Sequence, residues 1–226
     1  MRSTDPILEH VSRRLGGRPL PDDLLELLNL QGSDAASGSA NPLKEAGITF
    51  LDGDQLPAVI AAACAGETDL EGASRLAYAQ AMRDMVRYSG FVAEDATGSP
   101  IGYWFGPDQI PIESAPIMRY DTKGNFCILP GDGIAEAVSA VASGDSNLIF
   151  LKLRGYLNKR GFTIKARTLD DIRRRACSAS PQMVFQQLLR DYSADLSAAS
   201  IPHTGDPVYI MNIERGPELG PSGETR

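Results

Sequence analysis

The sequence predicts an α+β fold in which short antiparallel strands lie between two sets of helices. Apolar residues recur with helical spacing before about residue 88 and again after about residue 131, whereas the stretch between them contains short aromatic and β-branched runs separated by Gly, Pro, Asp and Asn. A chain of 226 residues can bury one sizeable core, with or without a helical appendage. The content of 42% hydrophobic and 23% charged residues is typical of a folded protein.

The first helix is expected to begin at Leu20-Pro21-Asp22-Asp23, because proline suits the first turn and acidic side chains favour the positive end of a helix. Four leucines between residues 24 and 28 would form its apolar face, and the helix would end near Gln31. Residues 32–42 are rich in Gly, Ser and Ala, which predicts a mobile loop.

A short strand and two helices are predicted next. Residues 48–51 have strand composition and lie between glycines, and residues 54–65 should form a helix that Asp54 caps. Residues 69–88 should form a longer helix that places one apolar face on the core.

An antiparallel meander follows. The expected strands are residues 90–93, 101–105, 116–120 and 125–129. The last two would pair through the turn 121–124, in which Gly124 can take the positive φ that such turns require. Successive strand residues point to opposite faces, so Tyr103 and Phe105 should share one face of the sheet and Trp104 the other.

The rest of the chain is predicted to be helical up to about residue 200. The expected helices are residues 131–143, 146–160, 168–178 and 181–199. Residues 201–226 are rich in Pro and Gly, which predicts a largely irregular tail.

The net charge of −7 conceals an asymmetry along the chain. Residues 1–150 hold 21 acidic and 10 basic residues, whereas residues 151–200 hold 4 acidic and 10 basic residues. An acidic body disfavours nucleic acid and is compatible with a basic protein partner, because complementary potentials speed encounter. The basic segment 152–175 is interpreted as a solvated helix that balances this body, and a nucleic-acid-binding patch is the weaker alternative.

Several classes of protein are not indicated. The longest apolar stretch, residues 58–65, is far shorter than the roughly 20 residues that span a bilayer. The N-terminus lacks the apolar region of a signal peptide, so we expect a cytoplasmic protein. Three widely spaced cysteines predict buried thiols, and two isolated histidines predict no metal site. Because no catalytic or cofactor motif occurs, we nominate neither catalytic residues nor a cofactor.

Two segments carry a resemblance to a known family. The first is the helix LPDDLLELLNLQG, and the second is the block of residues 98–142. The block contains two glycines flanking an aromatic strand, a proline that opens the next strand, a Tyr-Asp turn with a following glycine, and a closing helix, at Gly102, Gly106, Pro116, Tyr120-Asp121 and Gly124. The helix and the block, in this order along the chain, resemble the SMI1/KNR4 (SUKH) superfamily over residues 18–143.

This resemblance implies a mostly antiparallel, curved sheet flanked by helices, with residues 144–200 as a helical extension packed on the module and residues 201–226 as a tail. It also implies a non-enzymatic bacterial protein that binds a protein partner, since many bacterial members look like immunity proteins that neutralise a toxin by stoichiometric binding. Fungal relatives suggest the alternative of a regulatory adaptor in cell-envelope synthesis.

Five residues are candidates for a partner-binding surface: Trp104, Asp108, Glu113, Asp121 and Asp132. Trp104 is interpreted first as sheet packing and second as an exposed interface anchor. The four acids are interpreted first as solvated loop residues and second as a concave surface for a basic toxin domain. An enzyme that uses an acid pair, such as Asp108 with Glu113, is the alternative from another class of protein.

Overall fold

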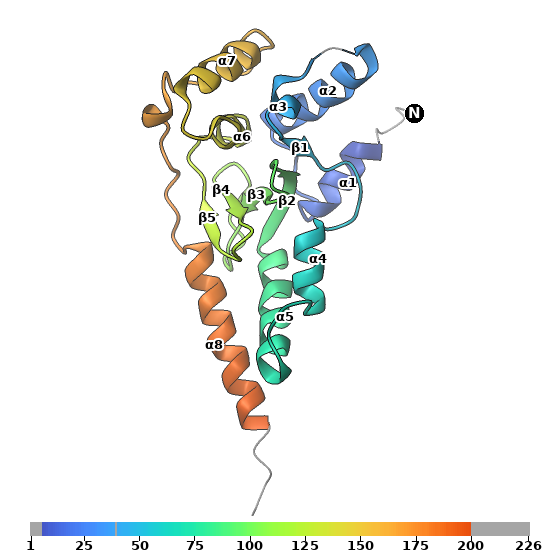
Figure 1. Ribbon diagram of the computed structural model, residues 1–226, viewed down its shortest axis with the longest axis vertical. Coiled ribbons are helices and arrows are strands. Elements are labelled where there is room, and N and C mark those ends of the chain that lie inside the picture. Colours follow the sequence, from blue (N-terminus) through green and yellow to red (C-terminus); the bar gives the residue numbers. More distant parts are fainter. Residues whose placement is uncertain (1–5, 39, 200–226) are drawn as a thin grey trace, which may run out of the picture.

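The computed structural model describes residues 6–38 and 40–199. Within these residues it contains eight α-helices and a five-stranded antiparallel sheet, which confirms the α+β prediction (Figure 1). The helices are α1 (Pro6–Arg14), α2 (Asp22–Ser37), α3 (Pro42–Glu45), α4 (Ala58–Ala65), α5 (Gly72–Arg87), α6 (Ile134–Ser143), α7 (Asn147–Asn158) and α8 (Pro181–Ala199). The strands are β1 (Thr49–Phe50), β2 (Ser89–Glu94), β3 (Pro100–Trp104), β4 (Ile117–Tyr120) and β5 (Phe126–Ile128).

The sheet is a simple meander in which each strand pairs with the next one along the chain. All four strand pairs are antiparallel, which confirms the meander predicted for β2 to β5 and adds β1 beside β2. The turn between β4 and β5 has Gly124 at a φ of 83°, so the requirement for glycine there is confirmed. The register shifts between Phe91 and Ala93 of β2, where a bulge bends the strand.

The two faces of the sheet belong to two different hydrophobic clusters. Tyr103 and Phe105 lie in the cluster shared with α1, α2, α6 and α7, whereas Trp104 lies in the cluster shared with α4, α5 and α8. The predicted division of these three aromatic residues between the faces is therefore confirmed. In Figure 1 the strands lie between an upper group that includes α2, α3, α6 and α7 and a lower group formed by α4, α5 and α8.

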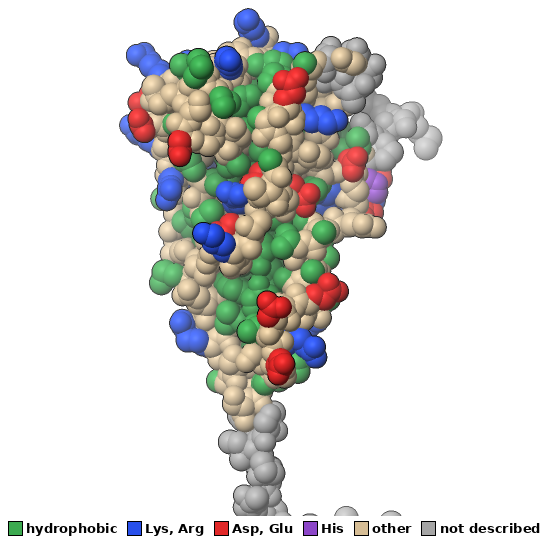
Figure 2. All heavy atoms as spheres, in the orientation of Figure 1, with side chains coloured by type: hydrophobic (Ala, Val, Ile, Leu, Met, Phe, Trp, Pro, Cys, Tyr) green, Lys and Arg blue, Asp and Glu red, His purple; other side chains and the backbone are tan. Residues whose placement is uncertain are grey.

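The two helices of the C-terminal extension each join one of these clusters. The buried face of α7 adds Phe150, Leu153 and Leu157 to the upper cluster. Helix α8 lies beside α5, and its Phe185 ring packs edge-on against Tyr78 with 5.5 Å between ring centroids. Figure 2 shows hydrophobic side chains gathered on the surface between α8 and α5.

Two helix boundaries differ from those predicted. Helix α2 continues to Ser37 instead of ending near Gln31, because a single glycine costs a helix only about 1 kcal/mol and alanines follow it. Helix α4 starts at Ala58 rather than at Asp54, since the residue before a proline disfavours helical geometry and Pro57 is the N-cap. Asp54 instead pairs with His10 and Arg13 of α1.

The helix predicted at residues 168–178 is wrong. Only Leu169–Asp171 forms a single 3₁₀ turn, closed by reciprocal hydrogen bonds between the ends of a Thr168–Asp171 capping box. Ile172 is already extended, and the chain then runs beside the end of β5, where Gly131 N donates to Arg173 O at 2.8 Å. Long-range pairing with residue 131 thus replaces the local hydrogen bonds of a helix.

Helix α1 was not predicted, although its sequence carries a signal for it. Val11 and Leu15 are fully buried, and their spacing of four residues is helical. The predicted irregular tail, residues 201–226, lies outside the described residues. Across residues 6–38 and 40–199, no helix has the length and apolar character needed to cross a membrane.

Candidate functional site

A groove with two adjoining halves lies where the start of α2, the start of α6 and the segment 161–173 meet. The first half, which we call the acidic half, has a volume of about 380 Å³ and includes Asp22, Glu26 and Asp132 in its lining. The second, which we call the basic half, has a volume of about 590 Å³ and includes Arg167 and Arg173. Both volumes lie in the range of binding sites.

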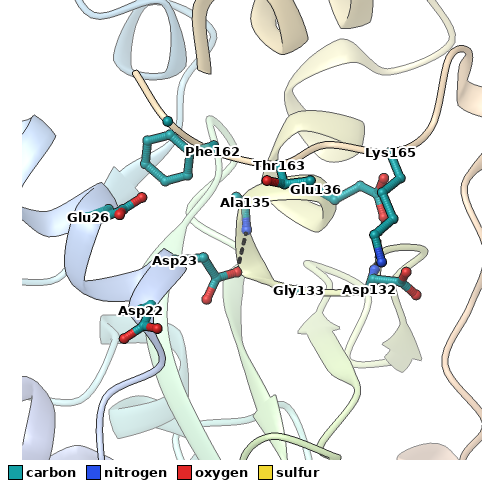
Figure 3. A pocket seen from close by; sticks show the side chains of 11 residues that line it. Asp22, Asp23, Glu26, Asp132, Gly133, Ala135, Glu136, Phe162, Thr163 and Lys165 are labelled. Carbon is teal, nitrogen blue, oxygen red and sulfur yellow. Dashed lines mark hydrogen bonds between the residues drawn. The ribbon is translucent and has the colours of Figure 1, made fainter. Parts of the chain in front are cut away.

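The acidic half forms because the first turn of α2 packs against the start of α6. Asp23 Oδ2 accepts a hydrogen bond from the backbone amide of Ala135 at 3.4 Å, and Oδ1 accepts one from Leu24 N at 2.9 Å (Figure 3). A Cβ atom at position 133 would lie 2.5 Å from Asp23 Oδ2, so a larger residue there would displace this carboxylate from its present position. The carboxylate of Asp23 therefore has a structural role in joining the two helices.

Glu136 joins the two halves. Its side chain is 7% exposed, and its carboxylate accepts hydrogen bonds from Asp132 N at 2.9 Å and from Ala166 N at 3.2 Å. One buried carboxylate thus ties the loop after β5 to the segment that carries Lys165 and Arg167. Buried carboxylates are stable in proteins when they are hydrogen-bonded in this way.

The charges of the groove come from distant parts of the sequence. Figure 3 shows Asp22, Asp23 and Glu26 on α2, facing Asp132 and Lys165 across the acidic half. In Figure 2, Lys and Arg side chains gather around α7 and the segment that follows it. The groove lies between the acidic part of the chain, before residue 150, and the basic part that follows it. Acidic side chains from the first part and basic side chains from the second part therefore line the same site.

Among the predicted acids, only Asp132 lines the groove. Asp108 and Glu113 are exposed in the loop between β3 and β4 and line neither half. Asp121 lies in the turn between β4 and β5, at the opposite end of β4 from that loop. The expectation of one concave surface formed by all four acids is therefore wrong, because an antiparallel meander sends successive loops to opposite ends of the sheet.

Trp104 is a core residue. Its side chain is 1% exposed, its Nε1–H donates to Ala179 O at 2.8 Å, and its ring lies edge-on to Tyr88. This burial contradicts the interpretation as an exposed interface anchor and supports the interpretation as sheet packing. The hydrogen bond also fixes the chain just before α8 onto the sheet.

Asp121 has the local role expected of an acid in a turn. Its Oδ1 atom accepts hydrogen bonds from Lys123 N at 2.9 Å and Asn125 N at 2.8 Å. Partial burial opposes ionisation, but hydrogen bonds from Asn125 and Lys123 outweigh it and lower the pKa of Asp121 below its ordinary value of 3.8.

Replacing Asp121 with alanine is expected to lower the free energy of unfolding by about 1 kcal/mol at pH 7, because two turn amides lose their acceptor. Since the folded state lowers the pKa of Asp121, its contribution is complete above 3.8 and is lost as the pH falls through the folded value. The difference between the two proteins should therefore shrink in strong acid, as measured by urea unfolding at pH 7 and pH 2.5. Asp121→Asn, which retains an acceptor oxygen, is the control.

Sequence reasoning missed most of the groove. Asp22 was recognised only as a helix-start residue, and Lys165, Arg167 and Arg173 only as members of a basic segment. The available signal was the change in sign of charge near residue 150, which does not say which acidic and basic residues meet. Of the three basic residues at 173–175, Arg175 instead donates to Glu113 O at 2.6 Å and Ala115 O at 3.2 Å.

The cysteines are free thiols. Cys127 is exposed on β5, which corrects the expectation that all three are buried, whereas Cys64 and Cys177 are half-buried. Among the described residues, no group of three or more His, Cys, Asp and Glu side chains is arranged to hold a metal ion.

Comparison of the chain with protein-family models gives no match, and comparisons with curated proteins and with solved structures give none either.

Proposed function

We propose that this chain is a protein-binding module that recognises a basic region of its partner through the acidic half of the groove. The single observation that carries the proposal is the set of three carboxylates, Asp22, Glu26 and Asp132, that line one cavity from two separate segments. Each is exposed, and none has a side-chain hydrogen bond or ion pair with another described residue. Their charges are available to a partner.

Within this class, the proposed role is that of a bacterial immunity protein that neutralises a toxin by stoichiometric occlusion in the cytoplasm. The resemblance of residues 18–143 to the SUKH superfamily supports this role, and an acidic groove suits a basic toxin domain. Because occlusion requires surface complementarity rather than bond chemistry, the proposed action involves no catalytic group. A carboxylate that loses water on contact must gain a hydrogen-bonded cation, so arginine and lysine are the expected partner residues.

The proposal is tested by tagged pull-down from the organism that makes the protein, followed by growth assays. The captured protein should arrest growth when it is expressed alone, and co-expression of this chain at equal stoichiometry should restore growth. A partner from envelope synthesis that does not arrest growth would contradict the immunity role and favour a regulatory adaptor.

The site is tested with matched charge-neutral variants. The triple variant Asp22→Asn, Glu26→Gln, Asp132→Asn is expected to bind the captured partner about tenfold more weakly, because three ion pairs of roughly 0.5 kcal/mol each are lost. The control Glu67→Gln, Asp69→Asn, Glu71→Gln removes three exposed charges between α4 and α5 and should bind as the wild type does. Calorimetry measures both affinities, and equal losses in the two variants would contradict the assignment of the site.

A further inference from the structure

The charged side chains of the groove divide into those that hold the fold and those that do not. Asp23, Glu136 and Asp171 accept hydrogen bonds from backbone amides, which occupies their carboxylates. Asp171, for example, accepts from Arg167 N at 3.2 Å and from Thr168 N at 3.0 Å. These three carboxylates hold together the segments that form the groove. The other charged side chains of the groove have no such role in the fold.

The remaining charges are three carboxylates and three cations. They are Asp22, Glu26, Asp132, Lys165, Arg167 and Arg173. All six are exposed, and within the described part of the chain none of their side chains forms a hydrogen bond or an ion pair. The groove therefore contains equal numbers of free positive and negative groups that do not neutralise one another by contact.

These free charges are separated in space. Asp22 and Glu26 line only the acidic half, Arg167 and Arg173 line only the basic half, and the boundary residues Asp132 and Lys165 line both. When the hydrogen-bonded carboxylates Asp23, Glu136 and Asp171 are counted as well, the acidic half is lined by five carboxylates and one cation, whereas the basic half is lined by three of each. The potential is therefore strongly negative in the acidic half, whereas in the basic half the exposed side chains of Arg167 and Arg173 are available to a carboxylate.

The simplest alternative to ligand binding is that these charges stabilise the fold by forming ion pairs with one another across the groove. Asp132 and Lys165 line the same two cavities, yet they form no contact within ion-pair distance. Glu136 already holds the two segments together through backbone amides. The fold thus does not need the six free charges to join its parts.

We propose that the groove binds a polypeptide segment that presents a basic side chain to the acidic half and an acidic side chain to the basic half. The inference rests on the proposed protein-binding function and adds the requirement for a charge pair of defined order. Because the halves adjoin and an extended chain advances about 3.3 Å per residue, the two partner side chains are separated by about two to four residues. The boundary residues Asp132 and Lys165 would each lie between the two charges of the partner.

A library of displayed linear 12-residue peptides, panned on the immobilised full chain at low salt, tests this requirement. Sequencing should show peptides with a Lys or Arg two to four residues from an Asp or Glu enriched about fivefold over the starting library, with one order of the two charges preferred. Raising the salt concentration should reduce the enrichment, because exposed charges are screened.

Two variants test which half of the groove recognises each charge of the peptide, and a third serves as the control. Asp22→Asn, Glu26→Gln, Asp132→Asn should abolish the preference for the basic residue only, and Lys165→Gln, Arg167→Gln, Arg173→Gln should abolish the preference for the acidic residue only. Arg75→Gln, Arg83→Gln, Lys123→Gln, which removes three exposed cations elsewhere, should select the same peptides as the wild type. Circular dichroism confirms that each variant is folded.

Two outcomes overturn the inference. If the selected peptides were enriched in basic residues but not in a nearby acidic residue, the proposal of a basic partner would still hold, and the requirement for a pair of opposite charges would be wrong. Absence of any charge pattern, or a pattern that both groove variants leave unchanged, would remove the groove as the site of recognition. Failure of the pull-down to yield a toxic partner would contradict only the immunity role, so the two failures are distinguishable.

Discussion

Replacing Trp104 with alanine is expected to lower the free energy of unfolding by about 3–5 kcal/mol, the usual cost of removing a large buried aromatic side chain. Trp104 is 1% exposed and packs with Phe91, Met118 and Phe185 in the cluster between the sheet and the lower helices. Its loss would also remove one of the two donors to Ala179 O, leaving only the Cys177 Sγ–H at 2.8 Å. Because the total stability of a domain is typically about 5–15 kcal/mol, this variant should be strongly destabilised.

Trp104→Phe removes the hydrogen bond and retains most of the packing. It keeps an aromatic ring and removes the Nε1–H donor, so the expected loss is about 1–2 kcal/mol. Trp104 is the only tryptophan, and unfolding in urea must therefore be followed by circular dichroism rather than by tryptophan fluorescence. Wild-type stability combined with lost partner binding in Trp104→Ala would instead assign the residue to an interface.

Replacing Glu136 with alanine is expected to lower the free energy of unfolding by about 2–4 kcal/mol, because two backbone amides would lose a charged acceptor in a buried position. The amides concerned belong to Asp132 and Ala166, on the two sides of the groove. Their hydrogen exchange should become faster than that of amides in the central strands, since the tie between the two segments is removed.

Glu136→Gln is the matched control. Its side chain has the same shape and a single carbonyl oxygen, so it can keep one of the two acceptor contacts and should lose less stability than the alanine variant. In both variants the free charges of the groove are unchanged. If the alanine variant left the exchange of both amides unaltered, Glu136 would not be the residue that positions the two halves.

Local features of the sequence were sufficient where local interactions decide the structure. The turn at residues 121–124 was predicted from the position of Gly124, and the structure confirms the positive φ of this residue. Asp121 stabilises the same turn by accepting hydrogen bonds from two of its amides. The division of Tyr103 and Trp104 between the faces of β3 follows from strand geometry alone.

The errors arose where distant segments compete with local preference. Residues 172–175 were predicted as helix, but their backbone pairs with Gly131 and Arg175 bonds to the loop before β4. Asp54 was predicted as a helix cap, but the proline at position 57 delays α4 and Asp54 pairs with α1. In both cases the side chain or backbone group that forms the contact lies more than 40 residues away in the sequence. For Asp54, the nearby proline also prevents the helix from starting where the cap was predicted.

The sequence by itself determined the α+β class, the meander of the last four strands and the asymmetry of charge, because periodicity, turn residues and composition act over a few residues. Only the tertiary structure decided that Trp104 is buried, that Asp132 is separated from Asp121, and that Asp132 meets Lys165 and Arg173 in one groove. Those relations depend on how the start of α2, the start of α6 and the segment 161–173 pack together. Packing of this kind is set by side-chain shape and long-range hydrogen bonds, for which the linear sequence carries no direct signal.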